Sequence, residues 1–257
     1  MFHRMDLLRN NLMNIYYIGG IGAVFMEMIG FIFRNIIRPF LPTIDQDPRF
    51  GDVTVPKEVA LEYANSEMRL LDTVLPWTSP GNRWMYEHDL SQAIQETVSP
   101  GDTVVIIGGG IGVTAVVAAQ EVAPNGSVIV HEGGEREVEW VNKTTAKNDV
   151  EDLVNVNHAL VGPGINVYSN SDDAEKLSAT ELPPYDVLVS DCEGAERQII
   201  KELNPNFETL LIETHGYHDS PTHEIESLLR EKEYEVNIVG LESIERDVRI
   251  IKAMVPN

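Results

Sequence analysis

The sequence is almost without cysteine. Cys192 is the single cysteine among 257 residues, so the chain can form no internal disulfide and cannot build a cysteine-based zinc site. A small residue at the end of an expected strand is more typical of packing than of a nucleophile. We therefore expect Cys192 to be a packing residue.

Basic residues are scarce as well. The chain has 41 Asp and Glu residues against 19 Lys and Arg residues, which gives a formal net charge of −22 at pH 7. Such a surface repels nucleic acid phosphates, so we expect no DNA or RNA partner. An acidic, Lys-poor surface around a normal core is typical of proteins from salt-loving microbes, because high salt screens the carboxylates. We predict a halophilic source; an acidic protein from an ordinary environment is the alternative.

Apolar runs of membrane-spanning length are absent except near the amino terminus. Residues 15–33 are apolar apart from Glu27, and arginines flank them on both sides. The Glu and four glycines weaken a membrane-spanning interpretation, and no small-residue cleavage site follows, so we expect no cleaved signal peptide. Three alternatives stay open: an interfacial helix, a weak anchor, and an arm packed on the domain or on a second subunit. We expect a cytoplasmic protein, with membrane contact through residues 1–40 in the first two cases.

The remainder of the chain has the composition of one α/β domain with additions. A polar linker punctuated by prolines, residues 41–48, indicates a boundary near residue 50. Helix-like spacing of apolar residues follows over residues 56–71 and 83–98. The predicted organisation is an amino-terminal arm over 1–50, a helical lead-in over 51–100 and an α/β domain over 101–257.

From residue 103 onward, strand-like segments alternate with helix-like segments. The first five strands, separated mostly by helices, predict parallel crossovers with ligands at the carboxyl ends of the strands. The last two strands are joined by too short a segment for a helix, which predicts an antiparallel hairpin. The strands are expected near 103–107, 127–131, 153–157, 186–190, 208–212, 234–239 and 248–254, and the helices near 112–123, 135–147, 193–203 and 221–232.

The most informative motif is a glycine-rich turn between a strand and a helix. Residues 103–114 read TVVIIGGGIGVT, and such glycines let backbone N–H groups approach a ligand closely. A second apolar strand ends at Glu132, about where a ribose-binding acid is expected. The pattern predicts a nucleotide-type cofactor. Because Gly110–Ala115 also fits G-x-G-x-x-A, an NAD-type dinucleotide-binding oxidoreductase is one alternative.

Further motifs stand at the ends of the expected strands. The blocks are PGDTVVIIGGGIG at 100–112, HE at 131–132, VLVSDCEGAE at 187–196 and LLIETH at 210–215. In order and spacing they resemble the motifs of the FkbM-type family of class I S-adenosylmethionine-dependent methyltransferases. The resemblance covers roughly residues 83–254, and its most specific element is the D-x-E-G-A-E block.

The resemblance carries expectations about fold and activity. It implies a Rossmann-like α/β fold with a seven-stranded, mostly parallel sheet, an antiparallel last strand and a helical amino-terminal extension. It also implies an O-methyltransferase that uses S-adenosylmethionine and acts on a hydroxyl of a glycan, a lipid-linked sugar or another small molecule.

On the cofactor side, the resemblance implies that Gly108, Gly110 and Gly112 bring the backbone against the methionine part of the cofactor. It implies that Glu132 accepts hydrogen bonds from the ribose hydroxyls. The chain differs from the family at Ile106, where an Asp usually contacts the cofactor's amino group. Loss of that charge-assisted bond weakens cofactor affinity roughly tenfold to a hundredfold. A catalytically inactive, methyltransferase-like binding domain is therefore a further alternative.

On the acceptor side, the protein must align a hydroxyl with an already activated methyl group and take up a proton. His215 is the candidate base, because the ordinary pKa of histidine, about 6.5, lies close to neutral pH. Asp191 or Glu193 would orient His215 or take the proton themselves. These side chains, with Glu213, could also hold a divalent cation such as Mg²⁺. We do not expect one and assign no metal ligand, because hard-cation sites lack a diagnostic spacing.

Several polar residues in these motifs also have ordinary structural explanations. Glu193 and Glu196 open a predicted helix, so they could simply favour its dipole. His218 and His223 have no motif partner and are expected on the surface. Neither the acceptor nor the oligomeric state is predicted by any motif.

Overall fold

The computed structural model describes residues 47–66, 87–163, 169–203 and 209–256, together with the helical residues 20–22, 24, 25 and 29. The predicted arm over residues 1–50 therefore lies mostly outside the described residues, and its membrane contact stays a prediction. Within the described part of the chain, no helix combines the length and apolar character needed to cross a membrane.

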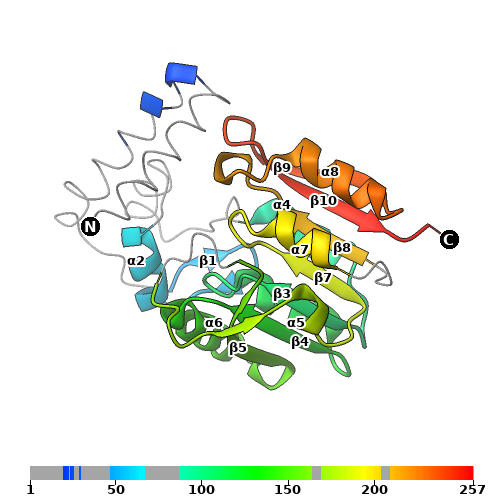
Figure 1. Cartoon of the computed structure of the whole chain (residues 1–257). Helices are drawn as coiled ribbons and strands as arrows, with labels where there is room; N and C mark the ends of the chain where they lie inside the picture. Colours follow the sequence, from blue (N-terminus) through cyan, green and yellow to red (C-terminus); the bar gives the residue numbers. More distant parts are fainter. Residues whose placement is uncertain are drawn as a thin grey trace.

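A sheet with helices on both faces forms the body of the protein (Figure 1). Its strands are β3 (Thr103–Ile107), β4 (Ser127–Glu132), β5 (Val154–Val161), β6 (Glu175–Leu177), β7 (Val187–Ser190), β8 (Thr209–Glu213), β9 (Glu235–Ser243) and β10 (Val248–Met254). The helices are α2 (Lys57–Ser66), α4 (His88–Gln95), α5 (Val113–Val122), α6 (Glu135–Lys147), α7 (Glu196–Glu202) and α8 (Thr222–Glu231). The 3₁₀ turns are η3 (Glu151–Leu153), η4 (Ala179–Glu181) and η5 (Gly216–His218), and β1 (Arg49–Phe50) pairs with β2 (Val53–Thr54) in a separate hairpin.

The strand order is β6-β5-β4-β3-β7-β8-β10-β9. The pairs from β6 to β8 are parallel, whereas β10 runs antiparallel to both β8 and β9. The predicted parallel α/β sheet with an antiparallel last strand and a closing hairpin is thus confirmed, although the sheet has eight strands and not the predicted seven. The sequence missed β6, because this edge strand has only three residues and pairs with β5 alone.

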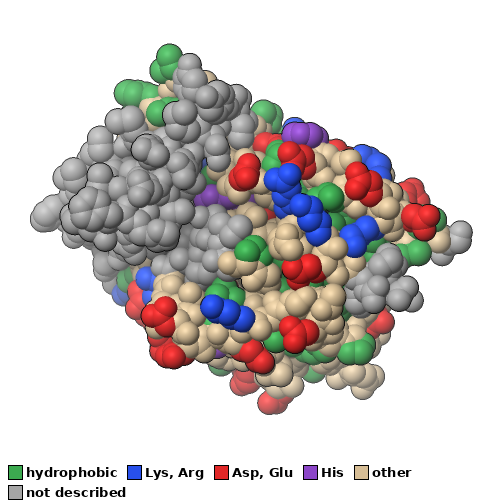
Figure 2. Space-filling model, in the orientation of Figure 1, with side chains coloured by type: hydrophobic (Ala, Val, Ile, Leu, Met, Phe, Trp, Pro, Cys, Tyr) green, Lys and Arg blue, Asp and Glu red, His purple; other side chains and the backbone are tan. Residues whose placement is uncertain are grey.

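The central strands are apolar on both sides because helices cover both faces of the sheet. Val104 and Ile106 of β3 lie in a core shared with helices α4, α5 and α6. Val105 and Ile107 of the same strand lie in a second core beneath α7 and α8. The outer surface is acidic: Figure 2 shows Asp and Glu side chains spread over the described part of the visible face.

The lead-in is joined to the same core. Phe50 and Val53 are buried in the same hydrophobic core as the apolar residues of α5. Asn148, which follows α6, donates to the carbonyl oxygens of Thr144 and Thr54 and accepts a hydrogen bond from the backbone N–H of Thr54. One side chain therefore caps the end of α6 and ties β2 to that helix.

The direction of chain progression reverses at β3, where β4 lies on one side and β7 on the other. Ligands of open α/β sheets bind at such a reversal, beyond the carboxyl ends of the strands. The turn after β3 and the turn after β7 meet here: the N–H of Asp191 donates to the carbonyl oxygen of Ile107 at 2.9 Å. A Cβ added at Gly108 would overlap the carbonyl oxygen of Asp191. Glycine is required at this position so that the two backbones can touch.

Gly108→Ala should therefore be strongly destabilising. Gly108 has a φ of 91°, which costs a residue with a Cβ about 1–2 kcal/mol, and the overlap with Asp191 adds to this. Gly101→Ala is the matched control, because Gly101 has a φ of 97° and open space around its Cβ position. Denaturant unfolding should show a loss of about 1–2 kcal/mol for the control and clearly more for Gly108→Ala. Equal losses would contradict the proposed backbone contact.

Candidate functional site

Two adjacent strands deliver acidic and imidazole side chains to one point. Asp191 directly follows β7, Glu213 is the last residue of β8, and His215 stands two residues beyond it. Glu196 opens α7, which starts three residues later than expected, because Glu193 and Gly194 form a turn with φ values of 51° and 105°. The predicted residues Asp191, Glu193 and His215 are thus brought together.

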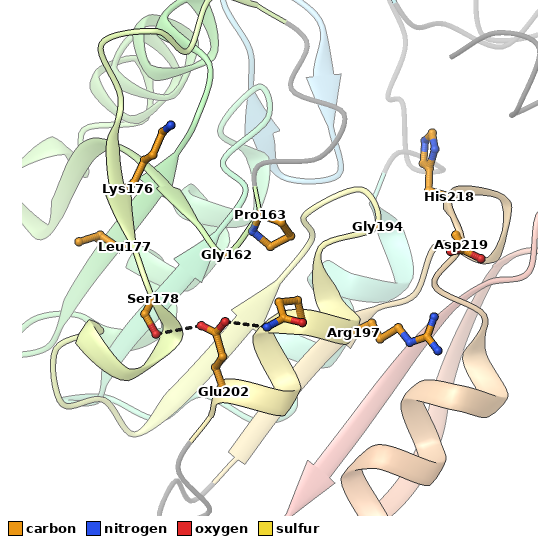
Figure 3. A pocket seen from close by; sticks show the side chains of 11 residues that line it. Gly162, Pro163, Lys176, Leu177, Ser178, Gly194, Arg197, Glu202, His218 and Asp219 are labelled. Atoms are coloured by element: carbon orange, nitrogen blue, oxygen red, sulfur yellow. Dashed lines mark hydrogen bonds between the residues drawn. The ribbon is translucent and has the colours of Figure 1, made fainter. Parts of the chain in front are cut away.

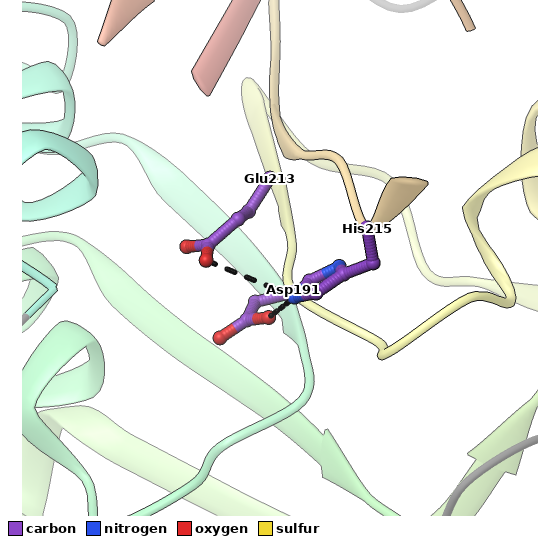
Figure 4. Close-up of side chains that lie close together, drawn as sticks. All are labelled: Asp191, Glu213 and His215. Carbon is purple, nitrogen blue, oxygen red and sulfur yellow. Dashed lines mark ion pairs between the residues drawn. The ribbon is translucent and has the colours of Figure 1, made fainter. Parts of the chain in front are cut away.

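The ring of His215 lies at the centre of this cluster (Figure 4). Its Nδ1 is 2.7 Å from Oε1 of the fully buried Glu196, which is a short hydrogen bond. Its Nε2 lies 3.4 Å from Oδ1 of Asp191, 3.7 Å from Oε1 of Glu213 and 3.8 Å from Oε2 of Glu193. One nitrogen of the ring is therefore fixed, and the other faces several carboxylates without a short hydrogen bond to any of the three.

Glu193 is held from the side by η5. Its Oε2 accepts a hydrogen bond from the Tyr217 hydroxyl at 3.0 Å and lies 3.0 Å from Nε2 of His218. The His218 side chain is only 7% exposed and its ring lies 4.0 Å from that of Tyr217. The expectation that His218 lies on the surface was wrong, because η5 folds back over the turn after β7. His223 is exposed as predicted.

The crowding of acids changes the proton affinities in the cluster. Burial alone would lower the pKa of His215, but Glu193, Glu196 and Asp191 outweigh it and raise that pKa well above its usual value. Burial, opposed by His215 and reinforced by Glu193, raises the pKa of Asp191 to about 7. Burial and the charge of Asp191 likewise raise the pKa of Glu213. A protonated His215 has no lone pair to act as a base, so proton uptake in this state falls to the carboxylates.

On the cofactor side, Glu132 holds the glycine turn through backbone bonds. Its Oε2 accepts from the N–H groups of Gly109 at 2.7 Å and Gly110 at 3.2 Å, and its Oε1 accepts from the N–H of Gly134 at 2.8 Å. Burial raises the pKa of Glu132 despite these bonds. A carboxylate offers about four acceptor positions, so one on Oε1 is left for a ligand hydroxyl.

The three predicted glycines occupy different surroundings. Gly108 and Gly110 are partly exposed, whereas Gly112 is buried. A Cβ at Gly112 would crowd Val141 and Thr144, so this glycine lets α5 approach α6. Ile106 is fully buried in the core and brings no polar group to the turn.

A cavity of about 630 Å³ opens beside the cluster (Figure 3). It shares Gly194 and His218 with the surroundings of Glu193. Seven of its eleven lining residues are polar or charged, and these include Lys176 of β6, Ser178 directly after it, Arg197 of α7, and Asp219 after η5. These residues can hydrogen-bond a polar ligand that reaches the cluster from this side.

Two residues of the cluster, Glu196 and Glu213, received no assigned role from the sequence. Glu213 and His215 stand two positions apart at a strand end, which was a usable indication that both side chains share a face. Glu196 gave no such indication, because it is 19 residues from His215 and its place in a first helical turn has an ordinary explanation.

Cys192 is partly buried, with its Sγ 3.2 Å from Oγ of Ser190, and burial raises the pKa of its thiol.

The chain was compared with known proteins. No protein-family profile matches it, and no curated protein is similar to it in sequence. Among solved structures it is similar to precorrin-6y C5,15-methyltransferase from Geobacter metallireducens, with a TM-score of 0.50 and 15% identity over 65% of this chain and 89% of that one. It is also similar to a SAM-dependent O-methyltransferase from Thermotoga maritima, with a TM-score of 0.47 and 17% identity over 65% of this chain and 64% of that one. The first likeness shows the Rossmann-like methyltransferase fold; membership of the FkbM-type family stays a prediction.

The raised pKa of Asp191 predicts a stability that falls as the pH rises. Between the ordinary Asp pKa of 3.8 and about 7, the folded protein holds a proton that the unfolded chain releases. This contribution is complete below about pH 4 and is lost as the pH approaches 7. Asp191→Asn removes the titrating group. Between pH 5 and 7, in cation-free buffer, the wild type should lose up to about 1.4 kcal/mol per pH unit relative to the variant.

Denaturant unfolding of both proteins at pH 5, 6 and 7 measures this difference. Because Asp191 also raises the pKa values of Glu213 and His215, the difference between the two proteins reports position 191 together with its effect on these two neighbours. His215 changes the slope in the same direction, since its raised pKa also makes stability decline above about pH 6.5. Parallel pH profiles for wild type and Asp191→Asn would show that Asp191 has an ordinary pKa.

Proposed function

We propose that this protein is an S-adenosylmethionine-dependent O-methyltransferase that acts on a hydroxyl of a glycan, a lipid-linked sugar or another small molecule. One observation carries the proposal. On a methyltransferase fold, the glycine turn with Glu132 and the acidic cluster around His215 stand at neighbouring strand ends, joined by the contact between Gly108 and Asp191. A cofactor turn and a proton-accepting cluster are therefore adjacent.

The turn fits the cofactor in part. Glu132 keeps one acceptor position beyond its three backbone bonds, and Gly108 and Gly110 are partly exposed beside it. When bound, S-adenosylmethionine supplies a methyl group that its sulfonium has already activated. Ile106 offers no charge to the amino group of the cofactor, so we expect weaker binding than a turn with an acid would give.

The cluster fits proton uptake. The side chains of Asp191 and Glu193 are 23% and 21% exposed, so an acceptor hydroxyl can reach them, whereas Glu196 is enclosed. Glu196 fixes one nitrogen of His215 and thereby sets the orientation of the ring between the two carboxylates. Asp191 and Glu193 are then the groups that accept the proton. His215 positions these carboxylates and offsets part of their negative charge.

The acceptor belongs in the cavity beside Glu193. Lys176, Arg197 and Asp219 in its lining can hydrogen-bond the hydroxyl groups of an acceptor. Residence in the cytoplasm, membrane contact through residues 1–40 and a halophilic source are parts of the same proposal. They rest on composition and on the apolar stretch at residues 15–33.

A second candidate is a catalytically inactive binding domain on the same fold. The buried Ile106, in place of a charged group, is the observation that favours it. The NAD-type alternative gains nothing from the structure, since the antiparallel β10 belongs to the methyltransferase arrangement.

Cofactor binding is tested by calorimetric titration of the folded chain with S-adenosylmethionine in high salt. We expect saturable binding, and Glu132→Gln should weaken it by about tenfold, because a hydrogen bond to a charged acceptor is lost. Glu135→Gln, on an exposed acid of the next helix, is the control and should bind like the wild type. Absence of heat with the folded wild type would exclude the proposed cofactor.

Catalysis is tested separately with Asp191→Asn. Transfer of labelled methyl groups to a panel of sugar and glycolipid acceptors should fall at least about a hundredfold, because a positioned proton acceptor is removed. Binding of S-adenosylmethionine should stay within a few-fold of the wild type. An active wild type whose turnover is unchanged by the substitution would remove Asp191 from the reaction. A wild type that binds the cofactor and methylates none of the panel would favour the inactive binding domain.

A further inference from the structure

The contacts of His215 Nε2 have the wrong length for hydrogen bonds. This nitrogen lies 3.4 Å from Asp191 Oδ1 and 3.7 Å from Glu213 Oε1, beyond the usual range of about 2.7–3.2 Å. Donor atoms of all three residues nevertheless lie within 4.8 Å of one another. The donor atoms of the three side chains face a common point but lie too far apart for direct hydrogen bonds.

These distances are close to those between donor atoms around a shared ion, and slightly longer. Ligand atoms about 2.1 Å from one metal ion are roughly 3.0–3.4 Å apart in octahedral and tetrahedral geometry. Figure 4 shows the Asp191 and Glu213 carboxyl groups turned toward the tip of the His215 ring. Small side-chain rotations would close the three donors on an ion.

Glu213 supplies an independent indication. The residue is 8% exposed, and its Oε2 has no hydrogen-bond partner in the part of the chain that the structure describes. A buried carboxylate oxygen without a donor is costly unless the group is protonated or a cation compensates its charge. The carboxylates within 4 Å of the His215 ring are Asp191, Glu193, Glu196 and Glu213. A single imidazole cannot neutralise all of them, even when protonated.

Glu196 completes the pattern from the other side of the ring. Histidine ligands of metals commonly donate their second N–H to a carboxylate, which fixes the tautomer and the ring orientation. Nδ1 of His215 makes this kind of bond, at 2.7 Å, to the fully buried Glu196. When the ring releases its second proton to bind a cation, the lone pair of Nε2 is directed at Asp191 and Glu213.

We infer that Asp191, Glu213 and His215 bind a divalent cation and that Glu196 positions the His215 ring for it. The sequence assigned no metal ligand here, so the inference rests on the geometry. An imidazole with two carboxylates suits Mn²⁺, Fe²⁺ or Zn²⁺ better than Ca²⁺. The role of the ion rests on the proposed function: beside the Gly108 turn, it would hold and polarise the acceptor hydroxyl, and Glu193 rather than the ion-bound Asp191 would then take the proton.

The site is tested by Mn²⁺ titration of the chelator-treated full chain, followed by the electron paramagnetic resonance signal of free Mn²⁺. We expect one bound Mn²⁺ per chain, with ¹⁴N coupling from one imidazole. Glu213→Gln and Asp191→Asn should each weaken binding at least about tenfold, since each removes a charged ligand. Glu235→Gln is the control, because Glu235 is exposed and pairs with Met254, far from the carboxyl end of β8.

Glu196→Gln tests the positioning role. We expect about ten- to a hundredfold weaker Mn²⁺ binding together with an altered ¹⁴N coupling of the ion that still binds. A general loss of stability would leave that coupling unchanged, and an unchanged coupling would overturn the positioning role. Thermal unfolding verifies that each variant is folded; if Glu213→Gln is not, the partly exposed Asp191→Asn decides.

The two proposals fail in different ways. A folded wild type that binds no Mn²⁺, or a folded ligand variant that binds it as tightly as the wild type, overturns the cation site. Neither result affects the calorimetric test with S-adenosylmethionine. Binding of Mn²⁺ without binding of the cofactor supports the site and overturns the proposed transfer reaction.

Discussion

The backbone contact between Gly108 and Asp191 is the constraint on which the rest of the site depends. It joins the turn after β3 to the turn after β7, at the place where the order of the sheet reverses. The cofactor turn and the acidic cluster cannot move apart without breaking it. Fixed backbone spacing of this kind is what allows reacting groups to be held within about 0.5 Å of a productive arrangement.

The acidic cluster has a different origin from the acidic surface. Surface carboxylates are hydrated and screened, whereas Glu196 and Glu213 are buried next to a histidine. The parallel strands β7 and β8 end at one edge of the sheet and bring Asp191 and Glu213 into the same small volume, and the start of α7 adds Glu196. The buried acids repel one another, which lowers stability, but their proximity places several donor atoms at one point. This is expected where function competes with stability.

The sequence predicted the sheet well because its strands are continuous apolar segments of ordinary length. It could not indicate β6, which has three residues and little apolar character. At the site, the motif blocks identified Asp191, Glu193 and His215 because they stand at strand ends. The roles of Glu196 and His218 depend on where α7 and η5 fold back, and no local spacing encodes that. Site roles for the glycines and Glu132 stay predictions, as does the halophilic source.

Two backbone hydrogen bonds to Glu132, from the N–H groups of Gly109 and Gly110, give the glycine turn one shape before any ligand arrives. A preorganised loop loses little conformational entropy on association, so more of the contact energy appears as affinity. In the proposed function, this rigidity offsets part of the cofactor affinity that is lost because Ile106 carries no charge. A binding site can thus replace a missing charge with a loop that has already been ordered.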